Sequence, residues 1–202
     1  MKKLICLFIG TLAFSLAGCQ EPTKNVDIVN DEGKPVMALD YRDFDQASSL
    51  MVQSLLKSPA LKKPDGTRYV MATSRIVNDT MQRIDVDQLL VKIRQELLNS
   101  GQVIMTAAIG REDATDPLIG EARTLRTNDE FDPNTVAAKK TLIAPELTLS
   151  GKIFQSVVGY TRGVQQVEYY FQLKVANVKT GLVIWENEQL IAKRGSSRSV
   201  SW

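Results

Sequence analysis

Residues 167–185, VEYYFQLKVANVKTGLVIW, decide the fold. Apolar or aromatic side chains occupy every second position from Val167 to Val175, and mostly polar ones lie between them. This period of two predicts a strand with one buried face. Residues 177–181 are polar and end in glycine, which indicates a turn, and residues 182–192 then read as a second strand. One face of that strand should carry Val183, Trp185 and Ile191. We expect Trp185 to be buried together with Tyr169, Phe171 and Leu173.

A third strand precedes these two. In residues 147–158 one face carries Leu147, Leu149, Ile153 and Val157. Residues 159–163 begin and end with glycine and supply a turn. The last three strands are therefore predicted to form an antiparallel meander.

The first half of the chain alternates helix and strand. Apolar residues recur at helical spacing from Phe44 to Leu56, and Pro59 ends this segment. Residues 68–77 read as a strand, and residues 102–109 as another. Between them lies a helix that Asp85 or Asp87 caps and Asn99-Ser100-Gly101 ends. The expected fold is an α/β domain with a mixed, largely antiparallel sheet flanked by helices.

Residues 110–134 are charged, contain two prolines and hold few apolar anchors, so we interpret them as a long loop or arm. Residues 135–144 are expected to form a short helix. The acidic run at 128–134 offers oxygen ligands for a weak calcium site, but an EF-hand loop needs Gly and Glu where Asn134 and Lys140 stand. A solvated loop is the preferred interpretation.

The N-terminus has the pattern of an export signal. Lys2 and Lys3 precede an apolar stretch, Leu4 to Leu16, that is too short to span a bilayer. The run Leu16-Ala17-Gly18-Cys19 resembles the lipobox of bacterial lipoproteins, in which cleavage leaves a lipidated Cys at the new N-terminus. We therefore predict lipid attachment at Cys19; the alternative is an ordinary secretory leader with a chance Cys.

This pattern divides the chain into a signal peptide over residues 1–18, a lipidated tether over 19–36 and one globular domain over 37–202. The tether is polar, and its residues after Cys19 reach roughly 55–60 Å when fully extended. Gln20 follows the modified Cys, whereas Asp at that position favours inner-membrane retention in enteric bacteria. Outer-membrane sorting, with the domain on the periplasmic face, is expected by this resemblance.

Composition excludes catalysis that depends on His or on a free thiol, so an enzyme here would need carboxylates, Lys, Tyr or a Ser-Lys pair. The chain has no His, and its two Cys lie at position 6 in the leader and at the lipidated position 19. Catalysis by Ser-His-Asp or Cys-His and His-ligated zinc are therefore excluded. Ser54-Leu55-Leu56-Lys57 and Lys179-Thr180-Gly181 fit two transpeptidase motifs, but the central S-x-N or Y-x-N is absent. We expect no enzymatic activity, no cofactor and no metal.

Charge also limits the partners. The formal net charge of +2 falls to about 0 once the leader, with two Lys and no acid, is removed. This balance gives no support for binding nucleic acid.

The C-terminal third resembles one family. Leu149-Ser150-Gly151-Lys152-Ile153, then residues 168–175, then residues 177–186 with Thr-Gly-x-x-Ile-Trp are similar to the LpoB family of outer-membrane lipoproteins. The resemblance implies a TolB-N-terminal-like α/β fold. It also implies a protein that docks onto the small regulatory domain of a class A penicillin-binding protein and activates peptidoglycan synthesis. Because the Thr-Gly/Trp motif recurs in CsgG-type secretion lipoproteins, the alternative is an envelope assembly or secretion-associated structural lipoprotein.

Candidate partner-binding residues come from composition. Tyr and Arg are common binding anchors, and loops on a rigid scaffold often carry function. Tyr160 and Arg162 lie in the turn region between two predicted strands, and Arg123 and Arg126 lie in the arm. We predict that these four residues contact the protein partner.

Overall fold

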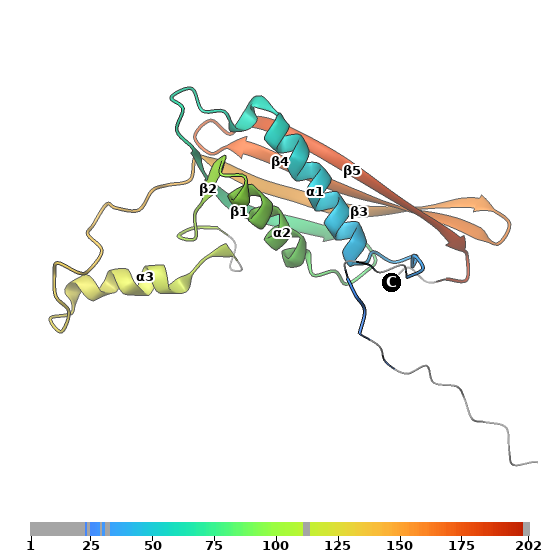
Figure 1. Cartoon of the computed structure of the whole chain (residues 1–202), viewed down its shortest axis with the longest axis horizontal. Coiled ribbons are helices and arrows are strands. Elements are labelled where there is room, and N and C mark those ends of the chain that lie inside the picture. The colour runs from blue at the N-terminus through green and yellow to red at the C-terminus, as the bar shows by residue number, and fades with distance from the viewer. Residues whose placement is uncertain (1–22, 24, 29, 31–32, 111–113, 200–202) are drawn as a thin grey trace, which may run out of the picture. The chain divides into compact units, whose positions relative to one another are not determined.

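One five-stranded sheet organises the domain, in the order β2-β1-β3-β4-β5 (Figure 1). The computed structural model describes residues 23, 25–28, 30, 33–110 and 114–199. β1 pairs in parallel with β2 and β3, whereas β3, β4 and β5 form an antiparallel meander. The strands are β1 Tyr69–Asp79, β2 Val103–Met105, β3 Leu147–Thr161, β4 Val164–Asn177 and β5 Val183–Ser196. The predicted fold class is confirmed.

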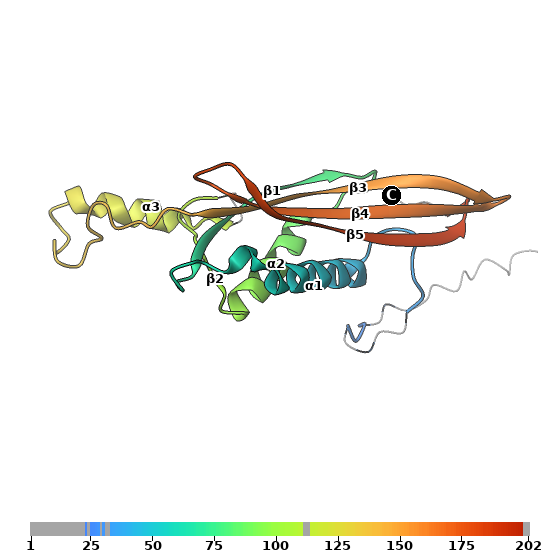
Figure 2. The same ribbon diagram turned by 90° about the horizontal axis from the view of Figure 1, so that it is seen from above.

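Two long helices cover one face of this sheet (Figure 2). α1, Tyr41–Lys57, begins with a capping box in which Asp40 and Asp43 exchange side-chain-to-backbone bonds, and it is followed by a short 3₁₀ turn, Pro59–Leu61. α2, Val86–Asn99, begins at Asp85, whose side chain accepts from the Asp87 N–H. Among the described residues, no helix has the length and apolar character needed to cross a membrane.

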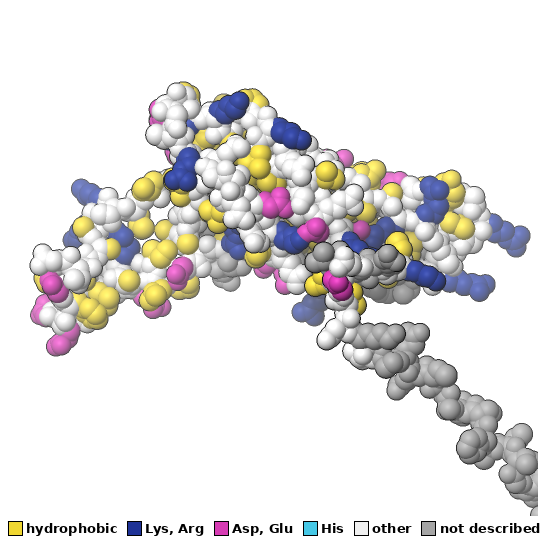
Figure 3. All heavy atoms as spheres, viewed as in Figure 1, with side chains coloured by type: hydrophobic (Ala, Val, Ile, Leu, Met, Phe, Trp, Pro, Cys, Tyr) yellow, Lys and Arg dark blue, Asp and Glu magenta, His cyan; other side chains and the backbone are white. Residues whose placement is uncertain are grey.

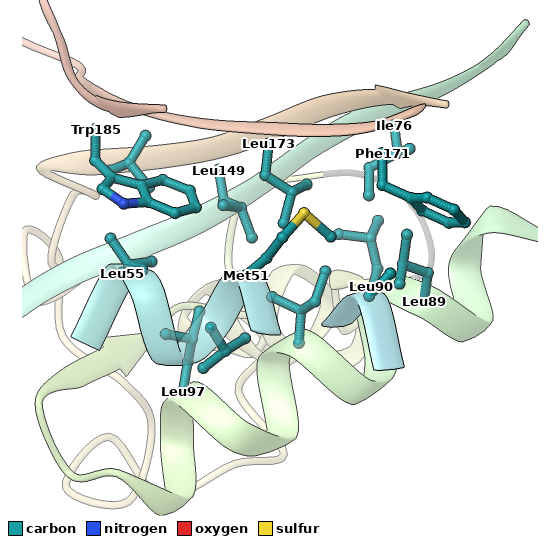
Figure 4. Close-up of a cluster of buried hydrophobic side chains, with 14 of the residues drawn as sticks. Met51, Leu55, Ile76, Leu89, Leu90, Leu97, Leu149, Phe171, Leu173 and Trp185 are labelled. Atoms are coloured by element: carbon teal, nitrogen blue, oxygen red, sulfur yellow. The ribbon is translucent and has the colours of Figure 1, made fainter. Parts of the chain in front are cut away.

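The core lies between the helices and the sheet. Met51 and Leu55 of α1 point toward the sheet residues Leu173 and Trp185, as Figure 4 shows. Tyr169, Phe171 and Leu173 are buried and Trp185 is 9% exposed, so the predicted buried face is confirmed. The buried leucines of α2 are Leu89, Leu90 and Leu97. Together these side chains form one continuous hydrophobic cluster, which fixes the sheet relative to both helices.

Val183 of β5 does not lie on the face that the sequence predicts for it. Val183 is exposed and pairs with Ala176, whereas Trp185 pairs with Val175. The extra residue, Ile184, makes a bulge that shifts the alternation by one position. Val183 therefore does not share the buried face of Trp185.

The segment between β2 and β3 also differs from expectation. It contains a short helix, α3 Pro117–Thr124, and a 3₁₀ turn, Leu125–Thr127, inside the stretch interpreted as loop. Asp116 caps α3 and Pro117 occupies its first turn, a favourable start signal. The helix predicted at 135–144 is wrong: these residues form turns, and Lys140 has a φ of 63°, which a right-handed helix does not allow. From here on, the arm means residues 114–146, which extend beyond the stretch 110–134 interpreted as an arm from the sequence.

Candidate functional site

The sheet face opposite α1 and α2 carries an ordered set of side chains. We call this surface the open face; Figure 2 shows both helices on the other side of the sheet. Strand alternation places on it every residue between the buried positions of β3 and β4. Its central members are Lys152, Phe154, Glu168, Tyr170, Glu188 and Leu190.

An aromatic pair forms the centre of the open face. Phe154 and Tyr170 lie directly opposite each other in the β3–β4 register, and their rings stack with centroids 4.7 Å apart and planes 4° from parallel. Leu190, the next residue across on β5, is 52% exposed. Lys152 lies 5.4 Å from the Phe154 ring centroid and forms a 2.5 Å ion pair with Asp79. The result is an apolar row with its rings fixed in place.

Hydrogen bonds continue from this pair along β4. The Tyr170 hydroxyl donates to Glu168 Oε2 at 2.7 Å, and Gln166 Nε2 donates to Glu168 Oε1 at 2.6 Å. The bond from Tyr170, with that from Gln166, holds the pKa of Glu168 below its ordinary value. The same bond to Glu168 raises the pKa of Tyr170. Glu168 is therefore a carboxylate near neutral pH, with both its oxygens engaged.

Tyr160 belongs to the same network. The Arg194 guanidinium lies 3.6 Å from the centroid of the Tyr160 ring, and Arg194 Nη2 donates to Gln166 Oε1 at 2.6 Å. Tyr160 remains 53% exposed, so one side of its ring is covered while the rest is accessible. The structure thus brings the predicted Tyr160 together with the aromatic pair through Arg194, Gln166 and Glu168.

The other predicted contact residues lie elsewhere. Arg162 is exposed in the β3–β4 turn, next to Gly163, whose φ of 77° the turn requires. Arg123 Nη2 donates to Ala138 O at 2.8 Å, and Arg126 Nη1 donates to Ala137 O at 3.2 Å. The arm joins β3 at Leu147, thirteen residues before Tyr160, or roughly 43 Å at 3.3 Å per residue. Arg123 and Arg126 therefore hold the arm together and are not part of the Tyr160 network.

A depression of about 670 Å³ lies at the start of β3 on the open face. Its floor includes Ala72, Thr148 and Ala176, which face one another across three strands. Ile109 and Val178 contribute apolar walls. The depression lies about 20 Å along β3 from Phe154, at 3.3 Å per residue. Its lining is mostly apolar, which suits apolar side chains of a docked protein.

The remaining candidates form no chemical site. Ser54 Oγ accepts a bond from Asn187 Nδ2 at 3.0 Å, and Lys179-Thr180-Gly181 occupies the turn after β4. Across the part of the chain that the structure describes, no three Cys, Asp or Glu side chains gather as a metal site. Cys19, the predicted lipid attachment site, lies outside the described residues.

Sequence reasoning missed Phe154, Glu168 and Arg194. The available signal was an aromatic residue, Phe154, at a position that strand alternation assigns to the exposed face of 147–158. An aromatic side chain on the face of a strand that points away from the core indicates a binding role more strongly than an arginine in a charged arm.

Comparison with protein families identifies the chain. The family model of the peptidoglycan-synthase activator LpoB matches residues 43–191, which is 149 of 202 residues. The chain belongs to the LpoB family. The expected family is therefore confirmed, and with it the coarser functional expectation, a regulator of peptidoglycan synthesis.

The chain is also similar, at low identity, to several solved structures. The LpoB C-terminal domain from Escherichia coli is 14% identical, with 75% of this chain and 99% of that chain covered and a TM-score of 0.43. The corresponding domain from Salmonella enterica is 14% identical, with 74% and 98% covered and a TM-score of 0.41. The lipoprotein GNA1162 from Neisseria meningitidis is 10% identical, with 66% and 87% covered and a TM-score of 0.35. No curated protein matches the sequence.

Proposed function

We propose that this protein binds a class A penicillin-binding protein through the open face and stimulates its peptidoglycan synthesis without catalysing a reaction itself. Membership of the activator family supports the regulatory role. The observation that carries the proposed site is the stacked Phe154–Tyr170 pair, held beside Glu168 on a face that α1 and α2 leave uncovered.

Docking on the open face should cost little conformational entropy. Aromatic side chains are frequent binding hot spots, and fixing them before binding reduces the entropy lost on association. Stacking fixes the Phe154 and Tyr170 rings, while hydrogen bonds fix Tyr170 to Glu168. Leu190 extends the apolar contact area on β5. A partner gains the contact at a small ordering cost.

Polar groups around the pair supply specificity. Glu168 and Glu188 are carboxylates beside the aromatic row, and Gln172 Nε2 donates to Glu188 Oε2 at 2.6 Å. Lys152 and Arg194 lie to either side of the row. A matching partner therefore presents an apolar centre with charges of both signs around it. The depression between Ala72 and Ala176 offers a further, mostly apolar contact surface.

We further propose that the lipid anchor at Cys19 holds the protein at the periplasmic face of the outer membrane. The lipobox and Gln20 support this location. A diacylglycerol with an additional amide-linked chain anchors more firmly than a single acyl chain, which binds membranes only marginally. The domain over residues 37–202 then acts within reach of the tether.

The test is stimulation of a purified class A penicillin-binding protein from the same organism. The rate of glycan-strand polymerisation is measured with and without this protein, and binding of the two is measured in detergent. The double variant Phe154→Ser/Tyr170→Ser should lose both binding and stimulation, whereas Leu50→Ser/Val91→Ser changes two exposed apolar residues on the helices and should keep both. Circular dichroism establishes that both variants are folded.

Two results would contradict the proposal. Stimulation that survives Phe154→Ser/Tyr170→Ser moves the docking site away from the open face. Recovery of channel or appendage subunits alone from solubilised envelopes, with no synthase, favours the structural lipoprotein instead.

A further inference from the structure

One end of the sheet is purely basic. We call residues 157–167 and 194–199 the basic end; they contain Arg162, Arg194 and Arg198 and no Asp or Glu. The C-terminal residues fold against the β3–β4 turn, since Ser197 N donates to Gly163 O at 3.0 Å. Gln165 Nε2 also donates to Ser199 O at 3.0 Å. Arg198 is thereby held beside the turn that carries Arg162.

Apolar side chains accompany these arginines. Val157, Val158 and Tyr160 are all exposed in the last residues of β3. In the view of Figure 3, Lys and Arg side chains gather at the end where the β3–β4 hairpin projects in Figure 1, with hydrophobic side chains among them. Arginine with aromatic and branched apolar side chains is the composition that suits a membrane interface.

The tether joins the domain at this same end. Met37 lies over Gly195, where an added Cβ would come within 2.7 Å of the Met37 Sδ. Tyr169 donates from its hydroxyl to Met37 O at 2.9 Å. Gly195 pairs with Gln165 in the β4–β5 register, within the basic end.

A buried lysine fixes this junction further. Lys193 Nζ donates to Ala38 O at 2.6 Å and forms a 2.5 Å ion pair with Asp43. The chain that leads back to Cys19 is therefore fastened to the domain beside the basic end.

From this placement we infer that the basic end docks on an anionic phospholipid surface. Arg162 and Arg198 bind lipid phosphates through their guanidinium groups, which match phosphate oxygens bidentately, and Tyr160 and Val158 lie against the headgroup region. The orientation rests on the lipid anchor proposed above, because an anchored tether brings this end of the sheet to the bilayer. The basic end shares Tyr160, Gln166 and Arg194 with the network of the open face, whereas Phe154 and Tyr170 lie outside it and stay available to a protein partner.

The test uses the chain from residue 19 to 202 with Cys19→Ser, so that no lipid anchor contributes. The protein is sedimented with vesicles of phosphatidylglycerol and phosphatidylethanolamine, and separately with neutral phosphatidylcholine vesicles. We expect binding to the anionic vesicles that weakens as salt rises. Arg162→Glu/Arg198→Glu should reduce this binding about 25-fold, since each arginine removed weakens it about fivefold.

A matched control carries the same change in charge. Arg68→Glu/Lys179→Glu alters two exposed cations outside the basic end and should retain most of the binding. Equal losses in both double variants, equal binding to neutral vesicles, or no binding would overturn the inference. The inference would also be overturned if Arg162→Glu/Arg198→Glu reduced binding to purified peptidoglycan sacculi but not to vesicles.

Synthase binding in detergent separates this inference from the proposed function. Arg162→Glu/Arg198→Glu should still bind the synthase, and Phe154→Ser/Tyr170→Ser should still bind anionic vesicles. Loss of vesicle binding with synthase binding intact identifies the basic end as the affected surface. Loss of synthase binding in the arginine variant would instead assign these arginines to the protein partner and overturn the inference.

Discussion

The hydroxyl of Tyr169 in β4 donates a 2.9 Å hydrogen bond to the carbonyl oxygen of Met37, 132 residues earlier in the chain. The same hydroxyl accepts a 2.6 Å bond from Gln82 Nε2, and Gln82 Oε1 accepts from Leu39 N at 3.1 Å. One buried side chain thus ties the start of the domain to the middle of the sheet. The Met37 carbonyl is partly buried, so leaving it without this partner costs free energy.

Tyr169→Phe should lower the free energy of unfolding by about 1–3 kcal/mol, since it removes the donor for Met37 O and the acceptor for Gln82 Nε2. Urea denaturation measures the change. Tyr170→Phe on the same strand is the control: Tyr170 is only half-buried and its hydroxyl bonds to Glu168 on the open face, so its effect should be smaller. Equal effects of the two changes would contradict the role assigned to the Met37 bond.

Trp185→Ala should destabilise the protein by roughly 3–5 kcal/mol, as expected for a large aromatic side chain removed from a packed core. Trp185 is buried in the main hydrophobic cluster beside Leu55 (Figure 4). A thermal or urea melt provides the measurement. Leu190→Ala, an exposed position on the same strand, should cost less than about 1 kcal/mol. An unchanged melt for Trp185→Ala would show that the buried face of β5 is wrongly assigned.

Gly151→Ala should be destabilising by about 1–3 kcal/mol through overpacking. A Cβ at this position would lie 2.3 Å from Gln172 O and 2.7 Å from Leu173 Cδ2. The backbone oxygen cannot move aside without disturbing the β3–β4 pairing. Gly159→Ala, on the same strand with no atom within 4 Å of the added Cβ, serves as the control and should be tolerated. A full urea curve for each variant distinguishes the two outcomes.

The Tyr170–Glu168 bond should make stability depend on pH. Because the folded-state pKa of Glu168 lies below its ordinary value of 4.5, its contribution is present above that pH and lost as pH falls through the folded value. The stability difference between wild type and Tyr170→Phe should therefore shrink on acidification from pH 7. The carboxyl titration of Glu168, followed by NMR, should move to higher pH in Tyr170→Phe. An unmoved titration midpoint would exclude this bond as the main cause.

The local pattern of apolar residues in the sequence was enough to predict most of the fold. The alternation from Val167 to Val175 and the apolar stripes of the two helices predicted which side chains are buried. They could do so because each of these helices and strands packs only one of its faces against the core. The arm was not predictable in this way. In it, Arg123 and Arg126 bind the carbonyls of Ala138 and Ala137, contacts across 11 to 15 residues that no local period encodes.

The candidate site depended on register and on long-range pairing. Tyr160 and Arg194 are 34 residues apart in the chain. They meet because β3 and β5 both pair with β4, so that the Arg194 side chain reaches the Tyr160 ring across β4. A register irregularity between Gly159 and Thr161 also affects the local backbone at Tyr160. Composition could identify Tyr160 as a candidate, but it could not distinguish Arg194, which contacts the ring, from Arg162, which lies in the turn.

Lipid attachment provides the last prediction, and Cys6 provides its control. In cells fed labelled palmitate, the wild-type protein and Cys6→Ser should both be labelled, because Cys6 lies in the leader that cleavage removes. Cys19→Ser should carry no label, since the thiol that forms the thioether is gone. Equal labelling of Cys19→Ser and wild type would place the lipid on another residue and remove the basis for a tether that begins at Cys19.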